Sequence, residues 1–241
     1  RAAPDGYTLM FASSSTLSIV PTLQKTTYDP IRDFTAIGLV ASFPYFLVAP
    51  AASPATSLDE LILRGRSSSS QLSYGSAGNG AVNHLAGEWF KGEAMINAVH
   101  VPYRSDAAVV TDLMGGQLDF AFLAGTVALP QVKAGKLRML ASASAKPGLG
   151  GGGVLTLGDR FKGFAAEPWN GLMGPAGLPQ PIVTQLNAAI NEVMSRPDVV
   201  ARMASMEQFP FTGSPQQFTE HIKSQTVRWS GIIKASDIKV E

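Results

Sequence analysis

Residues 74–80 (YGSAGNG) bring a hydroxyl, an amide side chain and several glycines together between a predicted strand, 72–75, and a predicted helix, 81–91. The first backbone N–H groups of a helix have no partner within it and favour an anion, and glycine lets a ligand approach the backbone closely. An ordinary tight turn also favours Gly and Asn, so both interpretations stay open. On the first interpretation, a carboxylate would be contacted by Ser76, Asn79 and Gly80.

Three further turns with small or polar residues also follow predicted strands. The hydroxyls in them can cap the next helix or donate to a carboxylate. Arg104 can clamp a carboxylate or pair with Asp106 at the surface. Turns at the carboxyl ends of parallel strands share one edge of a sheet, so we expect all of them to converge on one anion site. The candidate ligand-binding residues in these turns are Ser13, Ser14, Ser15, Thr16, Tyr103, Arg104, Ser105 and Thr126.

Residue types that would support catalysis or metal binding are scarce. The chain has no cysteine and three histidines, and no Asp, Glu and His set has metal-ligand spacing. Tyr74 stands where a Gly-x-Ser-x-Gly elbow around Ser76 would need glycine, and Asn83 stands where a dinucleotide fingerprint would need one. We interpret His84 and His100 as structural. The sequence therefore predicts no catalytic residue, no metal and no cofactor.

Composition and charge exclude other classes of protein. The 241 residues are 45% hydrophobic, and 19 Lys and Arg against 18 Asp and Glu leave a net charge of +1, without the basic excess that nucleic acid requires. Apolar runs such as 43–52 are too short to span a bilayer and contain Pro44 and Pro50. The chain opens with RAAPDG, without Met or a signal peptide, so we expect either a removed leader or a start inside a longer protein.

The order of predicted elements indicates an α/β fold. Strand and helix signals alternate to about residue 142, which predicts parallel βα units. The predicted strands include 7–12, 37–41, 98–102, 118–123 and 137–142. A helix is expected at 58–64, with Ser57 as N-cap and Glu60 completing a capping box. A glycine-rich loop follows at 147–153, and then a strand at 169–173 and three helices. The first of these helices is expected to begin near Pro181, because apolar residues recur at helical spacing from Ile182 to Val193.

A series of short motifs, in order along nearly the whole chain, resembles the Bug family, the solute receptors of tripartite tricarboxylate transporters. The ordered series of motifs is specific to this family. The motifs are APDGYTL at 3–9, YDP at 28–30 with DF at 33–34, SAGNG at 76–80 with HLAG at 84–87, VPY at 101–103, DLMGGQ at 112–117, AGKLR at 134–138 and RW at 228–229.

The resemblance implies a type II periplasmic-binding-protein fold of two α/β lobes, with crossover strands at about 44–50 and 168–174. Residues 1–46 with 168–241 would form a discontinuous lobe, and 50–167 a continuous one. Family members carry one βαβ unit ahead of the APDGYTL motif, so the first lobe is expected to be incomplete at its N-terminus. The absence of this βαβ unit would also remove one of the turns that surround the ligand.

The same resemblance implies a periplasmic receptor, a monomer without enzymatic activity. It would bind a small carboxylate in the interlobe cleft and deliver it to the membrane components of the transporter. The ligand would be a di- or tricarboxylic acid, an acidic amino acid or an aromatic acid, held largely by backbone groups, hydroxyls and water. Trp169, at the start of the return strand, joins the candidate contacts. Ser105 and the pair Ala124-Gly125 depart from the residues usual in the family, which bears on ligand identity.

Three alternatives remain beside this interpretation. The effector domain of a LysR-type regulator shares the lobed fold, although no helix-turn-helix precedes this chain. An α/β hydrolase-like enzyme would use Ser76 or Arg104. A truncated remnant that binds nothing is the third.

Overall fold

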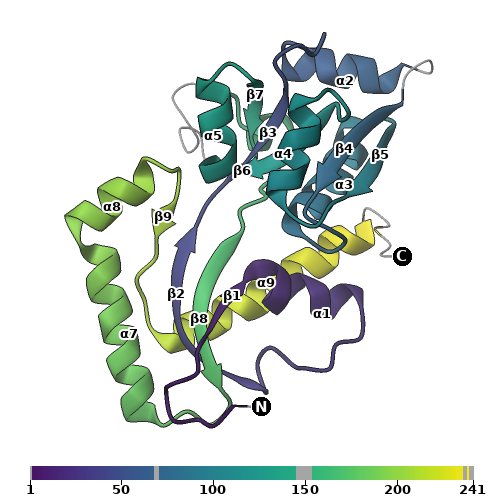
Figure 1. The fold of residues 1–241 in the computed structure, drawn as a ribbon. Coiled ribbons are helices and arrows are strands. Elements are labelled where there is room, and N and C mark those ends of the chain that lie inside the picture. The colour runs from purple at the N-terminus through teal and green to yellow at the C-terminus, as the bar shows by residue number, and fades with distance from the viewer. Residues whose placement is uncertain (1, 68–70, 145–153, 236–237, 239–241) are drawn as a thin grey trace. The chain divides into compact units, whose positions relative to one another are not determined.

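The structure is a computed structural model that describes residues 2–67, 71–144, 154–235 and 238 (Figure 1). The glycine-rich stretch at 147–153 and most of the serine run at 67–70 lie outside the described residues. Contacts divide the chain into two compact units, the first of residues 2–43 with 168–235 and the second of residues 44–167. No described helix is long and apolar enough to cross a membrane.

The first unit is built on an antiparallel sheet in the order β1-β8-β2-β9. The return strand β8 lies between β1 and β2. Its Gly171 is opposite Ala12 of β1 on one side and Leu39 of β2 on the other. The elements of the first unit are β1 (Met10–Ser13), the π-helix η1 (Ser15–Ile19), α1 (Val20–Leu23), β2 (Phe34–Ser42), β8 (Trp169–Pro175), α7 (Gln180–Ser195), α8 (Pro197–Ala204), β9 (Phe209–Pro210) and α9 (Pro215–Ala235).

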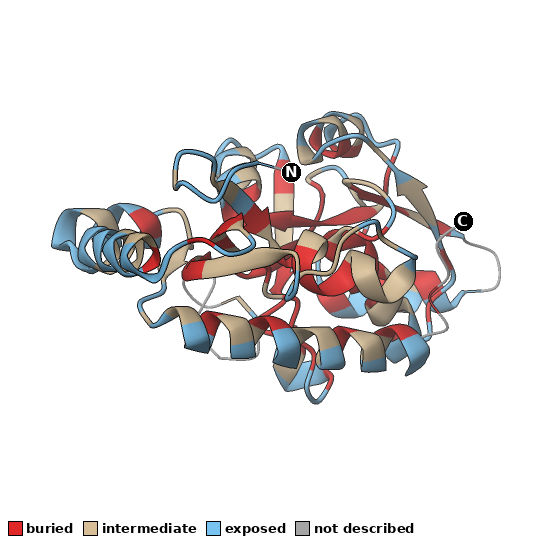
Figure 2. Ribbon diagram, turned by 90° about the horizontal axis from the view of Figure 1, so that it is seen from below, coloured by how far each residue is buried: buried red, intermediate tan, exposed pale blue. Residues whose placement is uncertain are grey.

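Helices cover both faces of this sheet because the side chains of a strand alternate between faces. Trp169 and Met173 of β8 pack with Phe218 of α9 on one face, and Leu172 packs toward α7 on the other. A Cβ at Gly171 would lie 2.1 Å from Cζ of Phe218, so glycine is what lets α9 approach β8 this closely. Along α9 the buried residues Phe218, Ile222, Trp229 and Ile233 recur on one side of the helix, and Figure 2 shows buried and exposed residues alternating along the helices in this way.

The second unit is built on a mixed sheet in the order β5-β4-β6-β3-β7. Strand β4 is parallel to both β5 and β6, whereas β3 is antiparallel to β6 and β7. Its elements are β3 (Tyr45–Pro50), α2 (Leu58–Arg66), β4 (Leu72–Ser76), α3 (Val82–Ala94), β5 (Ala98–Pro102), α4 (Asp106–Met114), β6 (Phe120–Ala124), α5 (Gly125–Lys133), β7 (Leu137–Ser142) and α6 (Leu157–Arg160).

This second sheet has an aliphatic face and an aromatic face. Ala121 and Leu123 of β6 pack against Val109 of α4. Phe120 and Phe122, on the other face of β6, both make edge-to-face contacts with Phe90 of α3. The central strand is therefore buried on both sides, which explains its uninterrupted apolar sequence.

The expected parallel arrangement of the first two strands needs correction. The strands predicted at 7–12 and 37–41 are not neighbours in a parallel sheet, because β8 lies between them and is antiparallel to both. The segments expected as crossovers form β3 and β8, one in each sheet. The capping box forms as expected, because the Ser57 hydroxyl accepts from Glu60 N and the Ser57 backbone N–H helps to lower the pKa of the Glu60 carboxyl. The largest contributions to that lowered pKa come from the hydroxyl and the backbone N–H of Thr56, which both donate to the same carboxylate.

Strand β1 is an edge strand, and we expect it to be less protected than the central strand β6. Among the described residues β1 pairs with β8 alone, and Phe11 is 64% exposed. Strand β6 pairs on both sides and is buried throughout. Native-state hydrogen exchange should therefore show weaker protection in 7–12 than in 118–123. Equal, strong protection in both segments would mean that something else completes the first sheet.

Candidate functional site

Three loops meet at one edge of the second sheet. Because β4 runs parallel to β5 and β6, the segments 76–80, 103–105 and 124–126 all lie at carboxyl ends on the same edge. Helices α3 and α4 begin after the first two segments, and α5 begins within the third, at Gly125. The fourth loop, 13–16, follows β1 in the sheet of the first unit. The expectation that all four turns share one sheet edge is therefore wrong for residues 13–16.

Most N–H groups of the loop 76–80 already have partners inside the protein. Ala77 N donates to Asn83 Oδ1 at 3.2 Å, and Gly78 N donates to the hydroxyl of Ser76 at 3.1 Å. Gly80 N donates to Nδ1 of His84 at 3.2 Å. The predicted row of unpartnered donors is thus largely occupied, and the loop is braced by side chains of the helix that follows it.

Two histidines stack beneath this loop. The ring centroids of His84 and His100 are 4.0 Å apart, and Nε2 of His100 lies 2.6 Å from the hydroxyl of Ser76. Burial lowers the pKa of His84, and burial together with the neighbouring His84 lowers the pKa of His100 to about 4. Both rings are therefore neutral near pH 7, which supports the interpretation of these histidines as structural.

A buried polar chain continues from the histidine pair. Tyr74 stacks on His100 at 5.0 Å and donates its hydroxyl to Glu88 at 2.6 Å. Burial alone would raise the pKa of Glu88, but hydrogen bonds from Lys91 and Tyr74 outweigh it and hold that pKa below its usual value. A Cβ at Gly87 would lie 2.1 Å from the Tyr74 ring, so this glycine makes room for the chain.

Asn83 joins the loop to the next helix. Its side-chain oxygen accepts from Ala77 N and from His84 N, and its nitrogen donates to Oδ1 of Asp106 at 2.8 Å. Burial raises the pKa of Asp106, although the bond from Asn83 acts in the opposite direction. Asn83 is fully buried, so its amide fixes the start of α3 against the start of α4.

The remaining candidate residues at this edge differ in their exposure and in the hydrogen bonds that they already form within the protein. Asn79, Arg104 and Thr126 are exposed, and Arg104 forms no ion pair with any described residue. The Ser105 hydroxyl caps α4 by accepting from Ala108 N at 3.4 Å. The hydroxyl of Tyr103 donates to Asp112 at 2.7 Å, and burial raises its pKa to about 12. Ser76 has no exposed surface.

In the first unit, residues 13–16 begin a π-helix, a form often found at functional sites. The hydroxyls of Ser13 and Thr16 lie 3.2 Å apart, and both residues are half-buried, as is Ser15. Ser14 is 1% exposed and its hydroxyl accepts from Trp169 N at 3.4 Å. Ser14 therefore holds the strand β1 to β8.

Trp169 is a core residue of the first unit. It is 1% exposed, and its ring makes edge-to-face contacts with Phe218 and His221. Its indole Nε1 has no hydrogen-bond partner among the described residues. The sequence expectation placed it at the ligand, whereas its surroundings are those of a packing residue.

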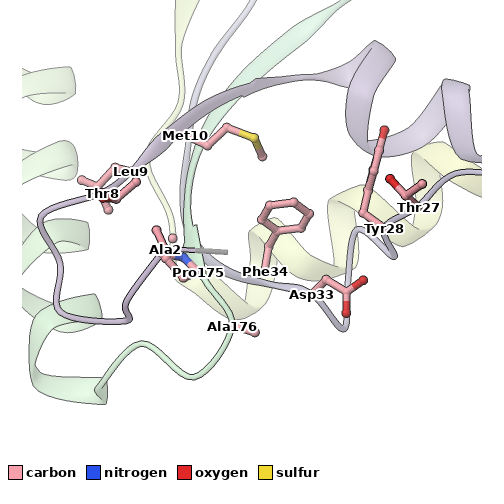
Figure 3. A pocket seen from close by; sticks show the side chains of 11 residues that line it. Ala2, Thr8, Leu9, Met10, Thr27, Tyr28, Asp33, Phe34, Pro175 and Ala176 are labelled. Atoms are coloured by element: carbon pink, nitrogen blue, oxygen red, sulfur yellow. The ribbon is translucent and has the colours of Figure 1, made fainter.

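The first unit also contains a cavity of about 440 Å³ that no sequence signal indicated. Met10 of β1 and Phe34 of β2 face it, and Tyr28 packs edge-to-face on Phe34 (Figure 3). It is lined by residues of all three neighbouring strands β1, β8 and β2. Its lining comes from Ala2, Thr8, Leu9, Met10, Thr27, Tyr28, Asp33, Phe34, Gly174, Pro175 and Ala176.

The described residues contain no cluster of three His, Cys, Asp or Glu side chains that could hold a metal ion. Two α/β units joined twice by the chain form the architecture of periplasmic solute-binding proteins, and the structure of the periplasmic binding protein BugD matches with a TM-score of 0.89 at 26% identity, over 100% of this chain and 82% of that one. The model of the tripartite tricarboxylate transporter family receptor matches residues 1–238. The chain belongs to this family, which confirms the resemblance to Bug proteins.

Similar proteins extend this assignment. The "UPF0065 protein in tcbD-tcbE intergenic region" of Pseudomonas sp. (strain P51) is 30% identical over 235 residues, which cover 97% of this chain and 70% of that protein. The structure of R. palustris Rpa4515 with adipate matches with a TM-score of 0.93 at 27% identity, over 99% of this chain and 81% of that one. MatC of Rhodopseudomonas palustris with bound malate matches with a TM-score of 0.84 at 26% identity, over 96% and 81%.

Proposed function

We propose that this protein is a periplasmic receptor that binds a small dicarboxylate and delivers it to the membrane components of a tripartite tricarboxylate transporter, without transforming it. The observation that carries the proposal is the fold similarity to two proteins whose structures contain adipate and malate. Both ligands are short, flexible and doubly negative near pH 7. The match of the family model over nearly the whole chain supports the transporter partner.

The ligand is proposed to bind at the edge of the second sheet. Helices α3, α4 and α5 all begin there, and helix N-termini favour negative charge. Arg104 is the exposed cation of this edge that has no ion pair with a described residue, and Thr126 adds a hydroxyl at the start of α5. Asn79 is the exposed side chain of the braced loop. These three residues are the leading candidates for direct contact.

The other candidate residues fall into two groups: some are proposed to contact the ligand, and others support the loop or the core. Ser76 and Gly80 shape the loop from within, because their polar groups have partners in the protein. Tyr103 and Ser105 remain proposed contacts. Each hydroxyl forms one bond within the protein, to Asp112 and to Ala108 N respectively, and keeps further hydrogen-bonding capacity for a ligand. In the first unit, Ser13, Ser15 and Thr16 stay proposed contacts, whereas Ser14 and Trp169 support the core.

One contact favours the alternative that this protein is an enzyme, but the burial of its two residues opposes that alternative. The hydroxyl of Ser76 lies 2.6 Å from His100 Nε2, as a nucleophile lies beside its base. However, Ser76 has no exposed surface, and a histidine with a pKa of about 4 is a weak base at pH 7. We expect no turnover of generic esters by this protein. Steady turnover that disappears in Ser76→Ala would contradict the receptor proposal.

A thermal-shift screen tests the proposal. The panel contains adipate, malate, citrate, glutamate and benzoate, with adipamide as the uncharged control for adipate. A ligand at about 100 times its Kd stabilises the folded state by about 2.7 kcal/mol. For a chain of this size that corresponds to a rise in Tm of about 5–11 °C. We expect at least one dicarboxylate to reach this range and adipamide to give no shift. No shift with any acid of the panel would contradict the proposal.

A further inference from the structure

The bond between Gly80 and His84 fixes the protonation state of the histidine. A backbone N–H can only donate, so Nδ1 of His84, 3.2 Å from Gly80 N, must present a lone pair. The proton of the neutral ring therefore lies on Nε2. A proton on Nδ1 would set two donors face to face and break the bond. The loop as observed requires a neutral His84, and Gly80 is held there at a φ of +77°.

The surroundings of His84 disfavour a charged ring on balance, because burial outweighs the opposite effect of the nearby Glu88 carboxylate. The ring is 4% exposed and stacks on His100 of β5, so charging both would bring like charges to about 4.0 Å. On its own helix, Glu88 and Lys91 face it, but they form an ion pair with each other at 2.8 Å. From β4 comes Tyr74, whose hydroxyl is bound to Glu88. Asp106 of α4 reaches the loop only through the amide of Asn83.

We propose that His84 is a positioning residue of the carboxylate site: its neutral ring holds Gly80 and the start of α3 in the binding geometry, and protonation of the ring releases them. The positioning of Gly80 stands on the hydrogen bond and the packing of the ring. Its effect on carboxylate affinity rests on the proposed function. His84 acts through Gly80 and does not itself touch the ligand.

The sign of the pH dependence follows from the burial of His84. In the ordered loop its pKa lies below the ordinary value of 6.5, and in the released loop it returns toward that value. Acid in the interval between the two values therefore favours the released loop. A carboxylate that needs the ordered loop should bind with constant affinity above about pH 7 and progressively more weakly below about pH 6.5.

Two substitutions separate the acceptor from the ring. His84→Asn keeps a hydrogen-bond acceptor at the δ position and cannot titrate. His84→Phe keeps the flat ring against His100 and removes the acceptor. The first readout is the NMR amide signal of Gly80 in the full chain without ligand, between about pH 7.5 and about pH 5. The amide of Gly135 is the internal control, because it also has a positive φ (+67°) but donates to a carbonyl, that of Val132.

We expect the Gly80 signal of the wild-type protein to move with pH while that of Gly135 stays. In His84→Asn it should not move with pH and should stay protected from exchange, and in His84→Phe it should exchange faster at every pH. A Gly80 signal that does not respond to pH in the wild-type protein, or that is unaffected in His84→Phe, would overturn the positioning role. This readout decides the role whether or not adipate binds.

The second readout is calorimetric affinity for adipate in the same three proteins. His84→Phe should bind about tenfold more weakly at pH 7.5, the effect of about one lost hydrogen bond. The ratio of wild-type to His84→Asn affinity should fall several-fold by about pH 5, and protonation of adipate itself cancels in this ratio. A pH-responsive Gly80 with an unchanged ratio would overturn the coupling to affinity alone. Failure of all three proteins to bind adipate would count against the proposed function and leave the Gly80 result intact.

Discussion

The replacement Gly80→Val is expected to abolish carboxylate binding while the second unit stays folded. Gly80 has a φ of +77°, a conformation that β-branched residues adopt only under strain of about 1–3 kcal/mol. The chain can relieve this strain by moving the loop, which breaks the bond from Gly80 N to His84 and displaces the start of α3. Calorimetric titration with the best dicarboxylate measures the affinity, and far-UV circular dichroism checks the fold.

The matched control is Gly135→Val. Gly135 has a φ of +67°, and a Cβ there would meet no atom within 4 Å, so this substitution imposes similar backbone strain away from the candidate site. It follows α5, at the end of that helix opposite to Thr126. We expect a lower Tm and unchanged affinity. Unchanged affinity in Gly80→Val would show that the site lies elsewhere, and the role of this loop would have to be abandoned.

The replacement Arg104→Ala is expected to weaken binding by about 1.5–3 kcal/mol, the usual contribution of a hydrogen bond to a charged group. That corresponds to an affinity about 10–150 times lower. Arg104 is exposed at the sheet edge and has no ion pair with a described residue, so its guanidinium is available for a bidentate contact. Loss of a cation that is not among the proposed contacts should not have this effect.

Arg202→Ala supplies that comparison, because Arg202 is exposed on α8 of the first unit and its removal changes the net charge equally. Calorimetry of both variants at two salt concentrations separates direct contact from general attraction, since exposed charges are screened by salt. Equal, small losses in both variants would mean that Arg104 is a solvated surface residue.

The extent of the fold that the sequence predicts depends on how local the signals are. Strands β5 and β7 have the predicted limits, 98–102 and 137–142, because turn residues mark both ends of each. Helix α7 was expected from Pro181 and its apolar spacing. The position of β8 between β1 and β2 could not be predicted, because that pairing joins residues about 130–160 positions apart and has no local signature.

In the candidate site, too, local features could be predicted from the sequence and long-range contacts could not. Residue types correctly identified the polar loops after β4, β5 and β6. They could not show that Gly80 and Ser76 would be engaged by His84 and His100, because those bonds depend on how α3 and β5 pack against the loop. A histidine four residues after a glycine places its ring near that glycine only once a helix has formed between them. The cavity of the first unit was missed because its lining comes from separate segments of the chain.

The most direct test of the central claim is isothermal titration calorimetry of the full chain with adipate, with adipamide as the matched uncharged ligand. The account predicts one adipate bound per chain, heat that is absent with adipamide, and adipate recovered unchanged after the titration. Equal binding of the diamide would contradict recognition of the carboxylates. Chemical alteration of the adipate would contradict the role of a receptor.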